Sequence, residues 1–156
     1  MGDKPTEIVI PKENALFRMD ARGYWHNAHG RFRKKSIIDH FNRSIRKDEA
    51  GYYVSQVNGD RIEKVYFPCE DTALFVTEVH GEDTLLLTLN TGEHLPLSLE
   101  SLFIQDDNLY LTRGDERIKF NERSLLQMAD RIEGDDDAWV LRVGGRRHPI
   151  RILSRN

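Results

Sequence analysis

The segment RFRKKSIIDHFNR at residues 31–43 recurs without a gap as KFNERSLLQMADR at residues 119–131. Both segments pair a basic residue with Phe, carry a serine followed by two aliphatic residues, and close on arginine. The segments that follow, residues 53–61 and 139–147, also resemble each other, but more weakly. Two copies indicate an internal duplication, because a solenoid needs more repeats than two. We therefore predict that a unit of strand end, helix and hairpin occurs twice in the chain.

Each copy predicts an amphipathic helix that begins at its serine. Ser36 and Ser124 are the predicted N-caps, and Asp39 and Gln127 occupy the position of a capping-box partner. Apolar residues then recur at helical spacing, which predicts one buried face on each helix. These faces are Ile37, Ile38, Phe41 and Ile45 in the first helix, and Leu125, Leu126, Ala129 and Ile132 in the second.

Short strand-like runs separated by turn signals fill most of the remaining chain. Asn58-Gly59 and Gly144-Gly145 predict tight hairpin turns after the two helices, and residues 73–99 predict an antiparallel meander between the copies. The predicted fold class is α+β, with the duplicated unit arranged around this meander and a partly closed barrel in the C-terminal half. We place an N-terminal α+β repeat unit at residues 1–66 and a C-terminal barrel-like unit, containing the second repeat, at residues 67–156.

The composition favours a globular protein of the cytoplasm. Hydrophobic residues make up 38% and charged residues 31% of the 156 positions. No apolar run reaches the roughly 20 residues of a membrane span, so no membrane partner is predicted. Residues 1–14 lack the apolar core of a signal peptide. Cys69 is the only cysteine, which rules out an intramolecular disulfide and fits a reducing compartment.

Catalytic and metal-binding signatures are missing from the sequence. The six histidines are scattered, and neither cysteine nor carboxylate frames His26 and His29 at zinc spacing. Phosphate-binding loops, dinucleotide fingerprints and hydrolase elbows are absent, and no nucleophile is paired with a base. We predict a protein that is not an enzyme and uses no cofactor or metal.

Charge is strongly segregated along the chain although the net charge is only −3. Residues 22–47 hold eight basic residues and one acid, residues 65–112 hold nine acids and no base, and residues 142–155 hold five arginines and no acid. Two basic arms thus flank an acidic middle. The arms either pair with the middle or converge on an anionic ligand.

The candidate site is the aromatic pair Tyr24-Trp25, which lies beside the first basic arm. Trp25, with Arg31 and Lys34 nearby, can stack on a base while the cations meet phosphate. The same pattern also describes a core tryptophan with a solvated basic rim. Glu70 and Asp71 can accept hydrogen bonds from a sugar or pair with arginine, or they are simply turn residues.

Five short motifs follow one another between residues 16 and 80: Gly23-Tyr24-Trp25, Ile37-Ile38-Asp39-His40-Phe41, Asp48-Glu49-Ala50-Gly51-Tyr52-Tyr53, Glu63-Lys64-Val65 and Cys69-Glu70-Asp71. Together they resemble a small bacterial family known as domain of unknown function 1285. The chain departs from the family pattern at Lys34, where arginine is usual, at added residues in 58–62, and in the spacing of 72–74.

The resemblance implies a duplicated core whose C-terminal part is similar to a pleckstrin-homology-like barrel. It also implies a nucleotide-like ligand, held in a groove between the halves, and a role in signalling. The residues expected to bind this ligand are Trp25, Arg31, Lys34, Lys64, Glu70 and Asp71.

We therefore predict a non-enzymatic module that binds a nucleotide-like or phosphate-bearing small molecule. The alternative is a protein-interaction module that recruits a protein partner through exposed β edges and segregated charge, without a small ligand. Binding of nucleic acid is disfavoured by the net charge of −3 and the acidic middle of the chain.

Overall fold

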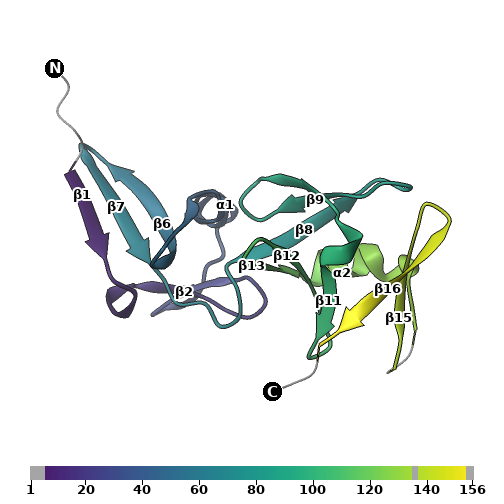
Figure 1. Ribbon diagram of the computed structural model, residues 1–156. Coiled ribbons are helices and arrows are strands. Elements are labelled where there is room, and N and C mark those ends of the chain that lie inside the picture. The colour runs from purple at the N-terminus through teal and green to yellow at the C-terminus, as the bar shows by residue number, and fades with distance from the viewer. Residues whose placement is uncertain (1–5, 135–136, 154–156) are drawn as a thin grey trace. The chain divides into compact units, whose positions relative to one another are not determined.

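The computed structural model describes residues 6–134 and 137–153 of the chain. The chain divides into two compact units, Met1–Ala73 and Leu74–Asn156. Strands dominate both, and each unit has one α-helix, α1 (Lys35–Arg43) in the first and α2 (Glu122–Met128) in the second (Figure 1). The predicted class, α+β, is confirmed at this level. The predicted boundary between residues 66 and 67 stays a prediction.

The first unit holds two small sheets. One has four strands in the order β1-β7-β6-β5, in which β1 runs parallel to β7 and the other pairs are antiparallel. The other is the antiparallel sheet β2-β3-β4. The strands are β1 (Thr6–Ile10), β2 (Phe17–Met19), β3 (Trp25–Asn27), β4 (Gly30–Arg31), β5 (Ile45–Asp48), β6 (Gly51–Asn58) and β7 (Arg61–Tyr66), and a 3₁₀ turn, η1 (Lys12–Asn14), follows β1.

Aromatic rings form the core of this unit. The Trp25 ring centroid lies 4.8 Å from that of Phe67, 5.4 Å from Phe41 and 5.6 Å from Phe17, all edge-on. The indole Nε1 donates to Asn42 Oδ1 at 2.8 Å, so its polar atom is satisfied. Phe41 brings α1 into this cluster but is only half-buried, and no residue of α1 is fully buried. The prediction that the apolar face of α1 buries Phe41 holds only in part, because its ring packs against the rings of Phe17 and Trp25 but stays partly exposed.

The second unit is built on one sheet of nine strands, in the order β10-β9-β8-β13-β12-β11-β16-β15-β14. Two pairs, β8 with β13 and β11 with β16, are parallel, and the others are antiparallel. The strands are β8 (Leu74–His80), β9 (Leu86–Leu89), β10 (His94–Pro96), β11 (Leu102–Gln105), β12 (Asn108–Arg113), β13 (Glu116–Phe120), β14 (Ile132–Gly134), β15 (Trp139–Val143) and β16 (Arg146–Ile152); the 3₁₀ turns are η2 (Leu99–Ser101) and η3 (Ala129–Arg131).

The nine-stranded sheet stays open. Its edge strands β10 and β14 each pair with a single neighbour, so no closed barrel forms among the described residues. The antiparallel meander predicted for residues 73–99 is present as β8, β9 and β10. Leu87 and Leu89 of β9 are buried and the intervening Thr88 is not, which is the alternation expected of a strand with one face on the core.

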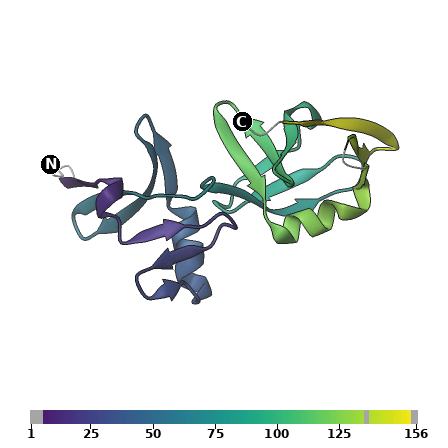
Figure 2. The same cartoon turned by 90° about the horizontal axis from the view of Figure 1, so that it is seen from below.

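Helix α2 is attached to the sheet through polar side chains (Figure 2, green helix). β13 ends opposite Val76 of β8, and the helix continues along the part of β8 that β13 leaves unpaired. The buried Ser124 hydroxyl donates to the Val76 carbonyl at 2.7 Å, and Gln127 Oε1 accepts from the Val79 N–H at 2.7 Å. These side chains thus satisfy backbone groups of β8 that have no neighbouring strand to pair with.

This attachment overturns two predictions for α2. The fully buried residues of the helix are Ser124 and Met128, whereas Leu125 is half-buried and Leu126 is 76% exposed. The predicted apolar stripe therefore does not face the core. The N-cap is Asn121, whose side chain accepts from the Ser124 N–H at 2.9 Å. In the same way Ser36 lies inside α1, which begins after Lys34.

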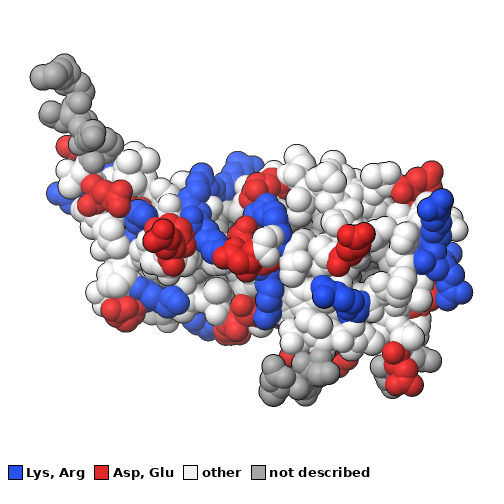
Figure 3. Space-filling model, viewed as in Figure 1, with Lys and Arg blue, Asp and Glu red and all other residues white. Residues whose placement is uncertain are grey.

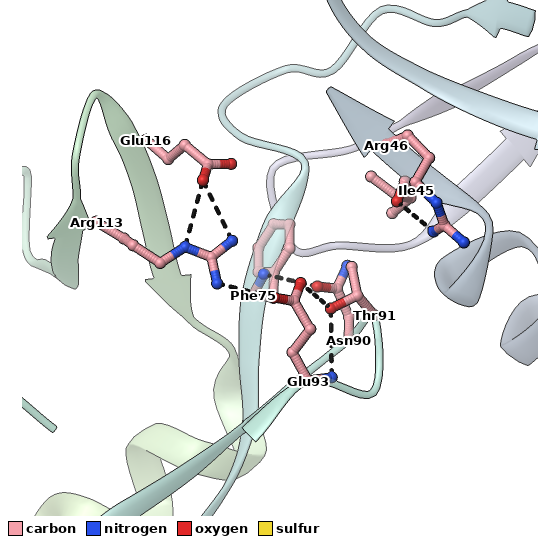
Figure 4. A network of polar contacts seen from close by, with 8 residues as sticks. All are labelled: Ile45, Arg46, Phe75, Asn90, Thr91, Glu93, Arg113 and Glu116. Carbon is pink, nitrogen blue, oxygen red and sulfur yellow. Dashed lines mark hydrogen bonds and ion pairs between the residues drawn. The ribbon is translucent and has the colours of Figure 1, made fainter. Parts of the chain in front are cut away.

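An arginine closes the β9–β10 turn of the second unit (Figure 4). Arg113 contacts Glu93 at 3.0 Å and Glu116 at 3.2 Å, and Thr91 donates to Glu93 at 2.8 Å. Asn90 fixes the same turn by accepting from the Phe75 N–H at 3.0 Å. Part of the acidic middle of the chain is thus paired with arginine that follows it in sequence.

Candidate functional site

Trp25, the predicted stacking residue, is a core residue. Its side chain is 1% exposed and is surrounded by the rings of Phe17, Phe41 and Phe67. A ring in this position cannot stack on a ligand unless the core opens. The alternative interpretation of the sequence pattern, a core tryptophan beside a solvated basic rim, describes its placement.

The neighbouring basic residues lie on the surface of the first unit. The guanidinium carbon of Arg31 lies 3.9 Å from the ring centroid of Tyr24, and that of Arg22 lies 5.5 Å from the same ring. The aromatic partner of the basic arm is therefore Tyr24, which holds these cations in cation–π contacts. Lys34 is exposed and occupies the N-cap position of α1.

Lys64 belongs to a separate polar cluster on the four-stranded sheet. Its Nζ donates to Asp48 Oδ2 at 2.8 Å, and the Tyr66 hydroxyl donates to the same oxygen at 2.6 Å. The Lys64 ammonium also lies 4.5 Å from the ring centroid of Tyr53. The hydrogen bond from Lys64, followed by the one from Tyr66, lowers the pKa of Asp48 from 3.8 to about 2. The same bond raises the pKa of Lys64. This lysine is thus engaged with its own sheet.

This cluster predicts an acid-sensitive contribution to the stability of the first unit. Because the pKa of Asp48 is lower in the folded state, its contribution is complete above 3.8, the value expected when unfolded, and is lost as the pH falls toward about 2. Urea unfolding of the wild type and Asp48→Asn should therefore show a difference in unfolding free energy that shrinks across this interval. Asp60→Asn, at the exposed β6–β7 turn, is the control. A difference between wild type and Asp48→Asn that does not change with pH would contradict the assignment.

Glu70 pairs with an arginine of the same unit. Its Oε1 accepts from Arg18 at 2.9 Å and its Oε2 accepts from the Ala21 N–H at 3.1 Å, so the carboxylate joins β2 to the turn after it. Asp71, next in the chain, is half-buried. All six predicted residues lie in the first unit, but four of them contact residues outside the predicted set: Trp25 contacts Phe67, Arg31 contacts Tyr24, Lys64 contacts Asp48 and Glu70 contacts Arg18. The predicted groove between the halves stays a prediction.

The described residues contain neither a metal-ligating cluster nor a helix suited to a membrane. Histidine, cysteine and carboxylate side chains nowhere gather in a group of three that could hold a metal ion. No helix in the described part of the chain has the length and apolarity to cross a membrane.

A polar pocket of about 350 Å³ lies in the second unit, and we call it the arginine pocket. Three arginines line it: Arg131 at the end of η3, Arg142 on β15 and Arg147 on β16. The Gly144–Gly145 turn between these strands and Glu82 and Asp83 in the β8–β9 loop complete it. Figure 3 shows basic atoms gathered at the right-hand end of the molecule, where Figure 1 places the β15–β16 hairpin.

Backbone carbonyl groups orient two of these guanidinium groups. Arg131 donates to the carbonyl oxygens of Glu82 at 2.8 Å and Gly81 at 3.0 Å. Arg142 donates to the Asp130 carbonyl at 2.8 Å and pairs with Glu133 at 2.7 Å. A carbonyl fixes a guanidinium group without neutralising its charge, and each group has five N–H donors. N–H donors therefore remain for a ligand, while Glu133 offsets part of the positive charge of Arg142.

Arg147 is the most accessible member of the pocket. Its side chain is 68% exposed and forms a 3.6 Å ion pair with Glu133, the carboxylate that also pairs with Arg142. The turn before it has a positive φ at both Gly144 (60°) and Gly145 (72°). These values suit glycine, and the absence of side chains there keeps the mouth of the pocket clear.

The sequence does not predict this pocket, although it reveals two of the segments that line it. The arginine-rich stretch at residues 142–155 was noted as a basic arm, and Gly144-Gly145 as a hairpin turn. The link to Arg131 and to the loop at residues 81–83 depends on sheet pairing between distant segments, which no local pattern contains.

No family model matches the chain, and no curated protein matches it. Among solved structures, the chain is similar to a DUF1285 family protein from Silicibacter pomeroyi DSS-3, with a TM-score of 0.61 and 18% identity over 94% of this chain and 84% of that one. It is also similar to a DUF1285 family protein from Shewanella baltica OS155, with a TM-score of 0.53 and 15% identity over 76% of this chain and 94% of that one. The resemblance to domain of unknown function 1285 is thus confirmed in the fold: this chain folds as those DUF1285 family proteins do.

Proposed function

We propose that this chain is a non-enzymatic cytoplasmic module that binds a phosphate-bearing, nucleotide-like small molecule in a signalling role, and that the arginine pocket is its binding site. The observation that carries the proposal is the convergence of Arg131, Arg142 and Arg147 on one pocket of about 350 Å³. A volume of this size lies within the range of small-molecule sites. The signalling role and the nucleotide class follow the family resemblance.

The chemistry of the lining favours a ligand with an anionic group and hydrogen-bond donors. Planar guanidinium groups bind phosphate or carboxylate through paired N–H donors, and arginine is preferred for this task. Glu82 and Asp83 bring acceptors to the same pocket. A simple anion leaves those carboxylates without a role, whereas a sugar phosphate or nucleotide offers them hydroxyl or amino groups.

The duplication predicted from the sequence is proposed here as the origin of both units. It is supported by the sheet order β1-β7-β6-β5, with β1 parallel to β7, which has a counterpart in β11-β16-β15-β14, with β11 parallel to β16. A helix precedes β5 in one set and β14 in the other. Superposing the two sets tests the idea, and helices that fail to coincide count against it. The likeness to a pleckstrin-homology-like barrel stays a prediction.

Thermal unfolding with a panel of nucleotides, sugar phosphates and inorganic phosphate tests the proposed function. A ligand that binds only the folded chain stabilises it by about 2.7 kcal/mol at a concentration one hundred times its Kd. We expect Arg147→Ala to weaken such binding about tenfold or more, because a hydrogen bond to a charged group contributes about 1.5–3 kcal/mol. This exposed side chain can be removed without disturbing a core contact.

Arg151→Ala is the matched control, because Arg151 is an exposed arginine on the same strand that does not line the pocket. Equal losses in both variants would indicate attraction by net charge alone. Binding that survives Arg147→Ala but is lost in Lys34→Ala would move the site to the first unit. If no anion in the panel raises the melting temperature, the protein-interaction alternative replaces this proposal.

A further inference from the structure

A second pocket in the second unit has the opposite character. It has a volume of about 380 Å³ and apolar walls made by Ile104, Leu109, Leu125, Ala129, Ile132 and Trp139. We call it the α2 groove. Leu125, Ala129 and Ile132 belong to the stripe that the sequence assigned to the core. Because Ser124 and Met128 take the buried side of α2 instead, this stripe lines an open groove.

Among the described residues, two side chains with hydrogen-bond acceptors line the α2 groove where the β11–β12 turn meets β12. Asp107 and Asn108 line the groove beside the apolar residues. Asn108 Nδ2 donates to the Asp106 carbonyl at 3.0 Å, which leaves its amide oxygen as an acceptor. Within the described residues the Asp107 carboxylate makes no hydrogen bond or ion pair. Both polar groups therefore accept hydrogen bonds, and one of them is negatively charged.

The turn holds these acceptors in a fixed conformation. Asp106 and Asp107 have φ values of 51° and 64°, in the left-handed region that a two-residue hairpin turn requires at both positions. Glycine is the usual second residue of such a turn, and a side chain there is adopted at some cost in free energy. Asp107 thus places a carboxylate at the groove where glycine would be the relaxed choice.

We propose that the α2 groove binds a small apolar amine. The apolar body lies along Leu125, Ile132 and Trp139, and the ammonium group donates to the Asp107 carboxylate and the Asn108 amide oxygen. Trp139, a half-buried residue of the same lining, can add a cation–π contact. A carboxylate or phosphate ligand is disfavoured, because Asp107 is the only ionisable residue among the described residues of the lining and would repel it.

Three molecules with one aromatic body and different head groups test the charge of the ligand: 2-phenylethylamine, 2-phenylethanol and 3-phenylpropanoate. Binding to the full chain is followed by ¹H–¹⁵N NMR. The chain has two tryptophans, Trp25 in the core of the first unit and Trp139 in the groove, and Trp139→Phe assigns their indole signals. We expect the amine to shift the Trp139 indole signal and the Asp107 and Asn108 amide signals, and to leave the Trp25 indole unchanged.

The amine should bind up to about fivefold more tightly than the alcohol, because the Asp107 carboxylate is exposed, and the acid should bind most weakly. Asp107→Asn should remove the preference for the amine while keeping binding of the alcohol. Leu126→Ala, on the exposed side of the same helix, should change neither affinity. Equal binding of all three molecules, absence of any shift, or an amine preference that survives Asp107→Asn overturns the proposal. Binding of a lysine-containing amphipathic peptide without binding of the amine would also overturn it, in favour of a protein partner. The result is independent of the arginine pocket, whose residues do not line this groove.

Discussion

Replacing Trp25 by alanine is expected to lower the free energy of unfolding of the first unit by about 3–5 kcal/mol. The side chain is 1% exposed and makes edge-on contacts with three phenylalanine rings. Its removal leaves a cavity between β3, α1 and the chain near Phe67, and it leaves Asn42 Oδ1 without its indole donor. Urea unfolding followed by far-ultraviolet circular dichroism measures the change.

Two further variants separate packing from hydrogen bonding at this position. Trp25→Phe keeps an aromatic ring but loses the donor to Asn42, so its loss should be smaller than that of the alanine variant. Leu16→Ala, at a side chain that is 84% exposed, should change stability by less than about 0.5 kcal/mol. A loss below about 1 kcal/mol for Trp25→Ala would show that the indole is not part of the core and would restore it as a candidate for stacking.

Met128→Ala is expected to cost the second unit about 2–5 kcal/mol, the second large effect. Met128 is fully buried and is the apolar contribution of α2 to the core, next to the polar attachment by Ser124. Leu126→Ala, two positions earlier on the same helix, should cost less than about 0.5 kcal/mol because its side chain is 76% exposed. The sequence pattern predicts the reverse order, so equilibrium unfolding of these two variants decides between the two faces.

The two helices could be predicted from sequence in position but not in orientation. Helical spacing and a serine at each start predict helices that begin at Ser36 and Ser124. Both helices occur, but α1 begins at Lys35 and α2 at Glu122, so each serine lies inside the first turn. The buried face depends on what the helix packs against. For α2 the partner is a strand with unpaired backbone groups, which selects Ser124 and Gln127 over the leucines. A hydrophobic pattern contains no information about such hydrogen bonds.

The candidate sites, like the helices, could be predicted from the sequence only in part. An aromatic residue beside a basic run predicts either a stacking site or a core residue with a charged rim, and only the packing around Trp25 separates them. The charge of the C-terminal arm could be read directly, whereas the pocket at Arg131, Arg142 and Arg147 depends on long-range pairing. The anion predicted from charge segregation is thus kept in our proposal, at residues other than those the sequence selected.

The parallel strand pairs also set the order in which the units can be completed during synthesis. β1 pairs with β7, and Thr6 lies beside Arg61, so β1 has no partner in its sheet until the whole stretch up to Tyr66 has been synthesised. The hairpin of β6 and β7 is local and needs only the turn at Asn58 and Gly59. Local contacts form sooner than distant ones, because closing a long loop costs more chain entropy. Strand β1, with Val9 exposed at the edge even in the finished sheet, therefore has a long interval in which to pair wrongly.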